Sequence, residues 1–204
     1  MISHEHRCIF VHIPKCGGTS IEDAIWPGPR SEQDLWRGRY LNEDGLNQSL
    51  HHLYARQIRD VVGASVFSSY FKFAIVRNPW DRAVSQYVYV KLGWPRMSPR
   101  QVWRLATFSN FLKTVKSVED TKWASQHLYL YDDKGTLLVD HVGRFENLED
   151  EFQTIATRIG LYGIELPHMK KSRRRLYQEY YTSKTRDMVA EIYQKDIELF
   201  GYSF

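Results

Sequence analysis

The chain of 204 residues suits one α/β domain, residues 1–204, and leaves little room for a second. Hydrophobic residues make up 43% of it and aromatic residues 14%, which supports a packed core and excludes an intrinsically disordered chain. The net charge of +4 fits either an ordinary solvated surface or a pocket for an anionic ligand.

The two cysteines, Cys8 and Cys16, lie in or beside the first predicted strand, where a disulfide between them would require that strand to fold back on itself. Without a disulfide framework or a C-x-x-C metal spacing, a reducing compartment is the simplest inference. We find no run of about 18 apolar residues and no signal-peptide pattern, which predicts a cytoplasmic chain. A luminal domain trimmed of its anchor remains an alternative.

Short apolar runs predict buried strands, and apolar positions at helical spacing predict helices. In chain order we expect a strand at 8–13, helices at 19–26 and 52–62, a strand at 71–76, a helix at 80–92 after Pro79, helices from Ser98-Pro99 and at 109–116, a strand at 137–145, a helix from Asn147 to 159 and a helix at 183–200. Residues 30–50 are polar and predict no regular structure. This alternation predicts an α/β domain whose mostly parallel central sheet is flanked by helices and binds ligands beyond the carboxyl ends of its strands.

The first motif, P-K-C-G-G-T-S, joins the first strand to the first helix. Gly17 and Gly18 let the backbone approach a ligand, and the N–H groups at the start of the helix attract an anion. Lys15 adds a cation, while Thr19 and Ser20 add hydroxyl donors. The motif is a phosphate loop by mechanism but not a Walker A loop, because its lysine precedes the glycines. The alternative is an ordinary strand-to-helix turn.

The second motif, F-A-I-V-R-N-P-W-D-R-A-V-S-Q-Y, carries the more specific signal. Arg77 lies at the carboxyl end of a predicted buried strand, and Ser85 lies two turns into the helix that follows. Both could reach one phosphate, which an arginine binds through two parallel N–H groups. The alternative is that Arg77 pairs with Asp81 as a structural clamp, and we interpret Arg82 as structural.

Taken together, the two motifs resemble the nucleotide-binding elements of the PAPS-dependent sulfotransferases, which use 3′-phosphoadenosine 5′-phosphosulfate (PAPS). The resemblance is strongest to the branch that includes the carbohydrate sulfotransferases of the Golgi and their bacterial relatives. Residues 143–148 and 193–202 also look like features of that family. The resemblance implies a P-loop nucleotide-binding-like sulfotransferase fold and transfer of a sulfuryl group from PAPS to a hydroxyl or amine, without a metal. A saccharide is the first candidate acceptor, with 30–50 and 87–103 shaping its pocket.

The resemblance also implies which residues bind the donor. Those for its 5′ end are Lys15, Cys16, Gly17, Gly18, Thr19 and Ser20, and those for its 3′-phosphate are Arg77 and Ser85. The family loop usually reads K-T-G-G-T, so Cys16 keeps the N–H group but lacks the hydroxyl. The basic run K-K-S-R-R-R at 170–175 is either a solvated loop or a flap over the nucleotide; as a flap it would use Lys171, Ser172 and Arg173. We consider nucleic-acid binding less consistent with so short a run.

Transfer to a hydroxyl requires a general base, for which histidine is suited near neutral pH. In similar sulfotransferases a histidine upstream of the second motif has this role, and His52 fits that place best. His51 and Glu22 are the alternatives, and His12 is interpreted as a core residue. Lys15 and the loop N–H groups would stabilise charge on the departing oxygen. Two rival functions remain, a PAPS-binding module with a decayed site and a P-loop kinase.

Overall fold

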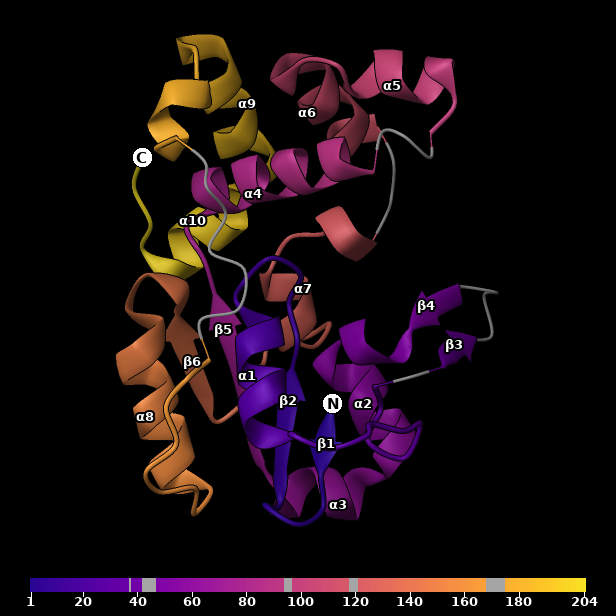
Figure 1. Cartoon of the computed structure of the whole chain (residues 1–204), viewed down its shortest axis with the longest axis vertical. Coiled ribbons are helices and arrows are strands. Elements are labelled where there is room, and N and C mark those ends of the chain that lie inside the picture. Colours follow the sequence, from indigo (N-terminus) through magenta and orange to yellow (C-terminus); the bar gives the residue numbers. More distant parts are fainter. Residues whose placement is uncertain (37, 42–46, 94–96, 118–120, 168–174) are drawn as a thin grey trace. The chain divides into compact units, whose positions relative to one another are not determined.

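The computed structural model describes residues 1–36, 38–41, 47–93, 97–117, 121–167 and 175–204 (Figure 1). The chain divides into two compact units. One contains residues 1–76 and 126–171, and the other contains residues 77–125 and 172–204. Among the described residues, no helix combines the length and the apolar character needed to cross a bilayer.

A four-stranded sheet forms the centre of the first unit. Its strands, in spatial order, are β1 (Ile2–Ser3), β2 (Cys8–Val11), β5 (Phe71–Val76) and β6 (His141–Arg144). β1 pairs with β2 antiparallel, whereas β2, β5 and β6 are parallel. Phe10 of β2 lies opposite Phe73 of β5, and their rings stack at 5.0 Å. All of β2 and nearly all of β5 are buried, as expected for strands inside a parallel sheet. The predicted mostly parallel α/β architecture is confirmed.

Helices and a small hairpin complete the first unit. They are α1 (Gly18–Ile25), β3 (Arg39–Leu41), β4 (Asn47–Ser49), the 3-10 turn η1 (Leu50–His52), α2 (Ala55–Val62), α3 (Ala64–Ser69), α7 (His127–Leu130), the 3-10 turn η4 (Phe145–Asn147) and α8 (Leu148–Arg158). The expectation of no regular structure over 30–50 is wrong where β3 pairs with β4. Each of these strands has only three residues, which is too short for hydrophobic alternation to mark it in the sequence.

Two further boundaries differ from prediction in this unit. The helix expected from residue 52 begins at Ala55, because residues 50–52 form η1 instead. The strand expected at 137–145 is shorter than predicted, because only β6, His141–Arg144, is a strand there. Leu137 forms an isolated bridge with Tyr131. Gly63, at φ 84°, separates α2 from α3.

The described part of the second unit is helical. Its elements are α4 (Pro79–Leu92), α5 (Pro99–Leu105), α6 (Phe108–Ser117), the 3-10 turns η3 (Thr121–Trp123) and η5 (Tyr177–Tyr180), α9 (Ser183–Ile192) and α10 (Gln194–Phe200). The Asn78 side chain caps α4 by accepting from the amides of Trp80 and Asp81. The helix predicted over 183–200 is two helices, since the backbone leaves helical geometry at Tyr193. That side chain is buried, and its hydroxyl donates to the carbonyl of Trp123 at 2.9 Å.

Candidate functional site

The loop between β2 and α1 has the backbone geometry of an anion site. Lys15 and Gly17 both have positive φ, 70° and 80°, which turns the chain sharply into α1. Such a conformation costs a non-glycine residue about 1–2 kcal/mol, and strain of this kind is common at functional loops. Gly17 occupies the N-cap position of α1 without a side-chain cap, and no acidic residue lies in the first turn. The amides at the start of α1, with the helix dipole behind them, therefore suit a phosphate or sulfate group.

Packing explains both glycines of this loop. A Cβ on Gly17 would lie 2.7 Å from Cδ2 of Leu148 and 3.1 Å from Cδ2 of Phe145. A Cβ on Gly18 would lie 2.0 Å from Nε2 of His12. Phe145 and Leu148 thus pack against the phosphate loop, and this packing is a structural reason for the residue types found at 143–148. The glycines are required by this packing whether or not the loop binds a ligand.

The remaining loop side chains differ in their surroundings. Cys16 is buried, and its Sγ lies 3.4 Å from Oε1 of Gln126 and 3.7 Å from the carbonyl oxygen of Pro14. Thr19 is half-buried, and Ser20 is buried. Because the thiol of Cys16 is directed at Gln126, its backbone amide is the group that a ligand could use.

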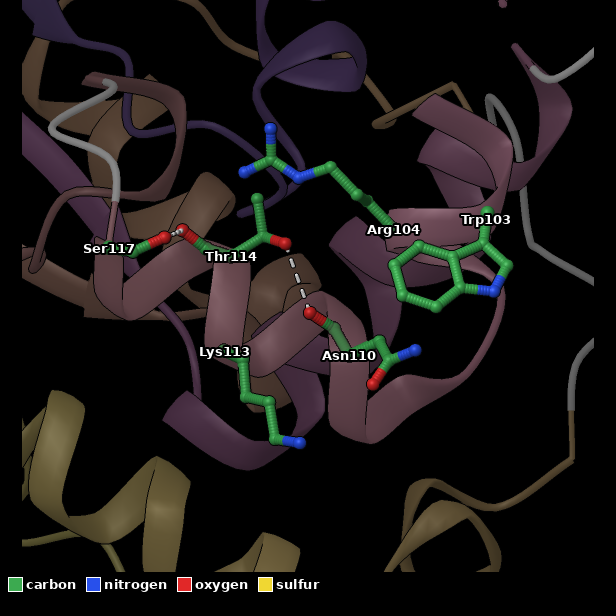
Figure 2. Close-up of a pocket in the computed structure, with 6 residues that line it drawn as sticks. All are labelled: Trp103, Arg104, Asn110, Lys113, Thr114 and Ser117. Carbon is green, nitrogen blue, oxygen red and sulfur yellow. Dashed lines mark hydrogen bonds between the residues drawn. The ribbon is translucent and has the colours of Figure 1, made fainter. Parts of the chain in front are cut away.

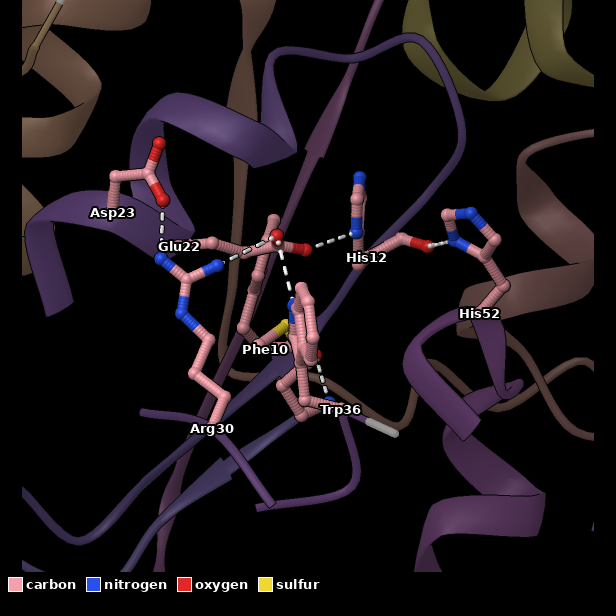
Figure 3. Close-up of polar contacts among 8 residues, drawn as sticks. Phe10, His12, Glu22, Asp23, Arg30, Trp36 and His52 are labelled. Carbon is pink, nitrogen blue, oxygen red and sulfur yellow. Dashed lines mark hydrogen bonds and ion pairs between the residues drawn. The ribbon is translucent and has the colours of Figure 1, made fainter. Parts of the chain in front are cut away.

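Three histidines gather beside this loop: His12, which directly follows β2, and His51 and His52 of η1. Figure 3 shows two of them, His12 and His52. The ring centroids of His12 and His52 are 4.6 Å apart, and those of His51 and His52 are 4.0 Å apart. The ring of His12 also stacks on Phe10 at 5.3 Å and touches Gly18. The structure therefore brings the predicted base and the predicted phosphate loop into one neighbourhood of the first unit, with His12 between them.

The hydrogen bonding of His52 defines its tautomer. Nδ1 of His52 lies 3.1 Å from the carbonyl oxygen of His12. A carbonyl can only accept, so Nδ1 carries the hydrogen and Nε2 carries the lone pair. Burial, reinforced by electrostatic repulsion from the neighbouring imidazoles of His12 and His51, lowers the pKa of His52 to about 2. His52 is therefore neutral near pH 7, and its Nε2 is able to accept a proton.

Glu22, the carboxylate alternative, is committed to other groups. Its Oε1 lies 2.6 Å from Nδ1 of His12, and its Oε2 accepts from Nε1 of Trp36 at 3.1 Å and from Nη1 of Arg30 at 3.4 Å. Burial alone would raise the pKa of Glu22, but His12, Trp36 and Arg30 outweigh burial and hold the pKa below its ordinary value. Figure 3 shows the carboxylate at the centre of these contacts.

The predicted 3′-phosphate residues lie in the second unit. Nε and Nη2 of Arg77 lie 2.8 and 2.7 Å from Oδ2 of Asp81, so the expected structural clamp is present. Ser85 lies in α4 and is half-buried. Arg82 is fully buried and donates to the carbonyl of Ala124 at 2.9 Å, in agreement with a structural role. Joint binding of one nucleotide by the two motifs stays a prediction.

Several sequence predictions lie outside the described residues. Residues 168–174 are among them, so the predicted flap residues Lys171, Ser172 and Arg173 have no structural description. Within the described ranges, no group of three or more His, Cys, Asp or Glu side chains could hold a metal ion.

A pocket of about 310 Å³ lies in the second unit between α5 and α6 (Figure 2). Its lining residues are Trp103, Arg104, Asn110, Lys113, Thr114 and Ser117. The indole of Trp103 is 72% exposed, and Trp103 belongs to the aromatic stretch predicted to shape an acceptor pocket. The hydroxyls of Thr114 and Ser117 donate to backbone carbonyls within α6. The lining groups that could face a ligand are therefore the indole of Trp103, the side-chain amide of Asn110 and the cations of Arg104 and Lys113.

The residue that sequence reasoning missed is His12. A usable signal was present, because Glu22 follows apolar Ile21 and precedes Ala24 and Ile25 on a short helix that must be largely buried. A buried carboxylate requires a partner. His12, in the predicted strand that leads into that helix, was the natural candidate.

Comparison with known proteins shows the family to which the chain belongs. The family model described as "Sulfotransferase family" matches residues 1–203. A protein of Archaeoglobus fulgidus, described as an uncharacterized protein, is 30% identical over 107 residues, which cover 52% of this chain and 82% of that protein. No solved structure matched. Because the family model spans almost every residue, the chain belongs to the sulfotransferase family.

Proposed function

We propose that the chain transfers a sulfuryl group from PAPS to a hydroxyl or amine of an acceptor. The observation that carries this proposal is the uncapped start of α1, which lies in one neighbourhood with the neutral His52. The first feature suits an anionic donor and the second suits removal of an acceptor proton. Membership of the sulfotransferase family supports the same reaction.

Donor binding is proposed for residues of both motifs. The 5′ end would be bound by the loop amides and side chains of Lys15, Cys16, Gly17, Gly18, Thr19 and Ser20. The 3′-phosphate would be bound by Arg77 and Ser85, and the flap by Lys171, Ser172 and Arg173. The backbone geometry of the loop supports the first assignment. The second rests on the resemblance and on the position of Arg77, which directly follows the last residue of β5.

In the proposed chemistry, Nε2 of His52 accepts the proton of the acceptor group as its oxygen or nitrogen forms a bond to sulfur. The bond between sulfur and the bridging phosphate oxygen breaks, and that oxygen keeps the electron pair. Lys15 and the amides of the loop stabilise the resulting charge. The negative charge of a bound donor would raise the pKa of His52 from its low value toward the working pH.

For the acceptor we propose a saccharide. The support is the exposed indole of Trp103, which with two cations and an amide lines the pocket in the second unit. An apolar ring face with a few polar groups around it is the usual lining of a small-ligand site.

The proposal is tested by incubating the protein with labelled PAPS and a panel of saccharides, amines and other alcohols. We expect release of 3′,5′-adenosine bisphosphate together with a labelled acceptor. His52→Gln should lower kcat by about 100-fold or more while binding of the bisphosphate is kept. His4→Gln is the matched control, because His4 is exposed and bonded only to the hydroxyl of Tyr70 among its described contacts.

A second candidate function follows from Cys16, whose thiol cannot replace the hydroxyl of the usual loop. A chain with a decayed site would bind the bisphosphate tightly and transfer nothing to any acceptor. Equal turnover by the wild type and by His52→Gln would instead remove His52 from the mechanism.

A further inference from the structure

A continuous set of contacts connects Glu22 to the proposed base. Oε1 of Glu22 lies 2.6 Å from Nδ1 of His12, and the carbonyl oxygen of His12 lies 3.1 Å from Nδ1 of His52. The side chains of Glu22 and His12 are only 6% and 10% exposed. Figure 3 shows these contacts following one another in a single row.

The carboxylate of Glu22 is less suited than His52 to act as a base in this arrangement. It is ionised at neutral pH, because its pKa is held below the ordinary value. Its two oxygens already face three donors, from His12, Trp36 and Arg30. A second carboxylate, Asp23, shares Arg30 with it but is not in contact with His12.

The contact between Glu22 and His12 fixes the orientation of the imidazole. The two atoms are 2.6 Å apart, and the contact is attractive only if Nδ1 carries a hydrogen. The opposite side of the ring, at Nε2, then meets the first residue of α1, where only a glycine leaves room for it. Stacking on Phe10 supports the ring from its face.

We propose that Glu22 and His12 position both halves of the site. Glu22 fixes the ring of His12, the ring supports the phosphate loop at Gly18, and the backbone carbonyl of the same residue sets the tautomer of His52. This inference rests on the proposed function. His12 is thus a positioning residue that couples donor loop and base, and Glu22 is its anchor.

Loss of the anchor should therefore affect both turnover and donor affinity. In Glu22→Gln an amide replaces the carboxylate, so the negative charge beside Nδ1 of His12 is lost while the shape is kept. Carboxylates that orient metal-bound histidines are worth about 10- to 100-fold in activity, and we take the same range for Glu22. We expect kcat to fall by about that factor and binding of 3′,5′-adenosine bisphosphate to weaken as well, because the ring that supports the loop at Gly18 is no longer held by the carboxylate. Asp23→Asn is the matched control and should leave both quantities near the wild-type values.

A second measurement does not depend on turnover. Two-bond ¹H–¹⁵N spectra of histidine rings report which nitrogen carries the hydrogen. In the wild type we expect Nδ1–H for His52 and a hydrogen on Nδ1 of His12. In Glu22→Gln the spectrum of His12 should change, and in Asp23→Asn it should not.

The two measurements distinguish the possible failures. A wild type with the expected tautomers but without turnover on PAPS would overturn the proposed function and keep the positioning role. Turnover that is unchanged in Glu22→Gln, or a wild-type His52 with its hydrogen on Nε2, would overturn the positioning role. If Glu22→Gln fails to fold, the wild-type spectrum still decides the tautomers, and Trp36→Phe, which removes one donor to Glu22, replaces it in the kinetic comparison.

Discussion

Replacing Gly18 with alanine tests the packing on which the site depends. The added Cβ would lie 2.0 Å from Nε2, 2.2 Å from Cδ2 and 2.7 Å from Cε1 of His12. The ring cannot swing away freely, because Glu22 holds Nδ1 and Phe10 covers one face. Overpacking of this kind costs about 1–3 kcal/mol. The backbone of Gly18 is not in the positive-φ region, so alanine should gain up to about 1 kcal/mol from helix propensity. Because the ring cannot relax, we take the upper part of the overpacking range, about 2–3 kcal/mol, and expect a net loss of about 1–2 kcal/mol in the free energy of unfolding.

Urea denaturation followed by tryptophan fluorescence measures this loss. Gly28→Ala is the matched control, since its Cβ would meet nothing within 4 Å and its φ is not positive; it should change the free energy of unfolding by less than about 0.5 kcal/mol. In a His12→Ala background the cost of Gly18→Ala should largely disappear, because the two residues are in contact. The reasoning is refuted if Gly18→Ala is as stable as the wild type, or if its cost is the same with and without the His12 ring.

Three further predictions concern the base, the donor and the acceptor. The pKa of His52 is lowered from 6.5 to about 2 in the folded chain. Between these two pH values the unfolded chain binds a proton at His52 that the folded chain does not bind. The free energy of unfolding therefore falls as the pH drops from about 6.5 toward 2. Because His52 is half-buried, we expect the free energy of unfolding to fall by about 1 kcal/mol more in the wild type than in His52→Gln between pH 7 and pH 5. Equal falls in the two proteins, measured by urea denaturation, would contradict this. Arg77→Ala should weaken the binding of 3′,5′-adenosine bisphosphate by about 10- to 100-fold in calorimetry, but the binding of adenosine 5′-phosphate only slightly. Asp81→Asn keeps the guanidinium of Arg77 and should leave the binding of both ligands unchanged. If Arg77→Ala weakens the binding of both ligands equally, Arg77 is purely structural. Trp103→Ala should raise the KM for a saccharide acceptor by roughly 2- to 10-fold with the KM for PAPS unchanged, and the equally exposed Tyr162→Ala should change neither; an unaltered acceptor KM would remove the indole from the acceptor site.

Local signals in the sequence predicted the elements that carry the two motifs. The apolar run at 71–76 is β5 without any change of boundary, because a strand buried in a parallel sheet has no polar face to interrupt it. Pro79 begins α4 and Ser98 caps α5, as their chemistry predicts. The turn from β2 into α1 lies where the glycines predicted it.

Features that depend on tertiary contacts were not predictable in the same way. The break at Tyr193 depends on a hydroxyl that finds a distant carbonyl at Trp123, and nothing in the local pattern marks it. The pair of His12 and Glu22 joins a strand end to a helix face, so its distance of 2.6 Å follows from the turn between them. The sequence supplied these residue types, but the folded turn determined which of them meet.

The central claim is that the start of α1 binds the 5′ end of the donor. Backbone amide chemical shifts measured during titration with 3′,5′-adenosine bisphosphate test it most directly. The account predicts large, saturable shifts at residues 16–20 and 77–85, and loss of the second set with adenosine 5′-phosphate. The account is contradicted if the nucleotide binds but the amide chemical shifts of residues 16–20 do not change.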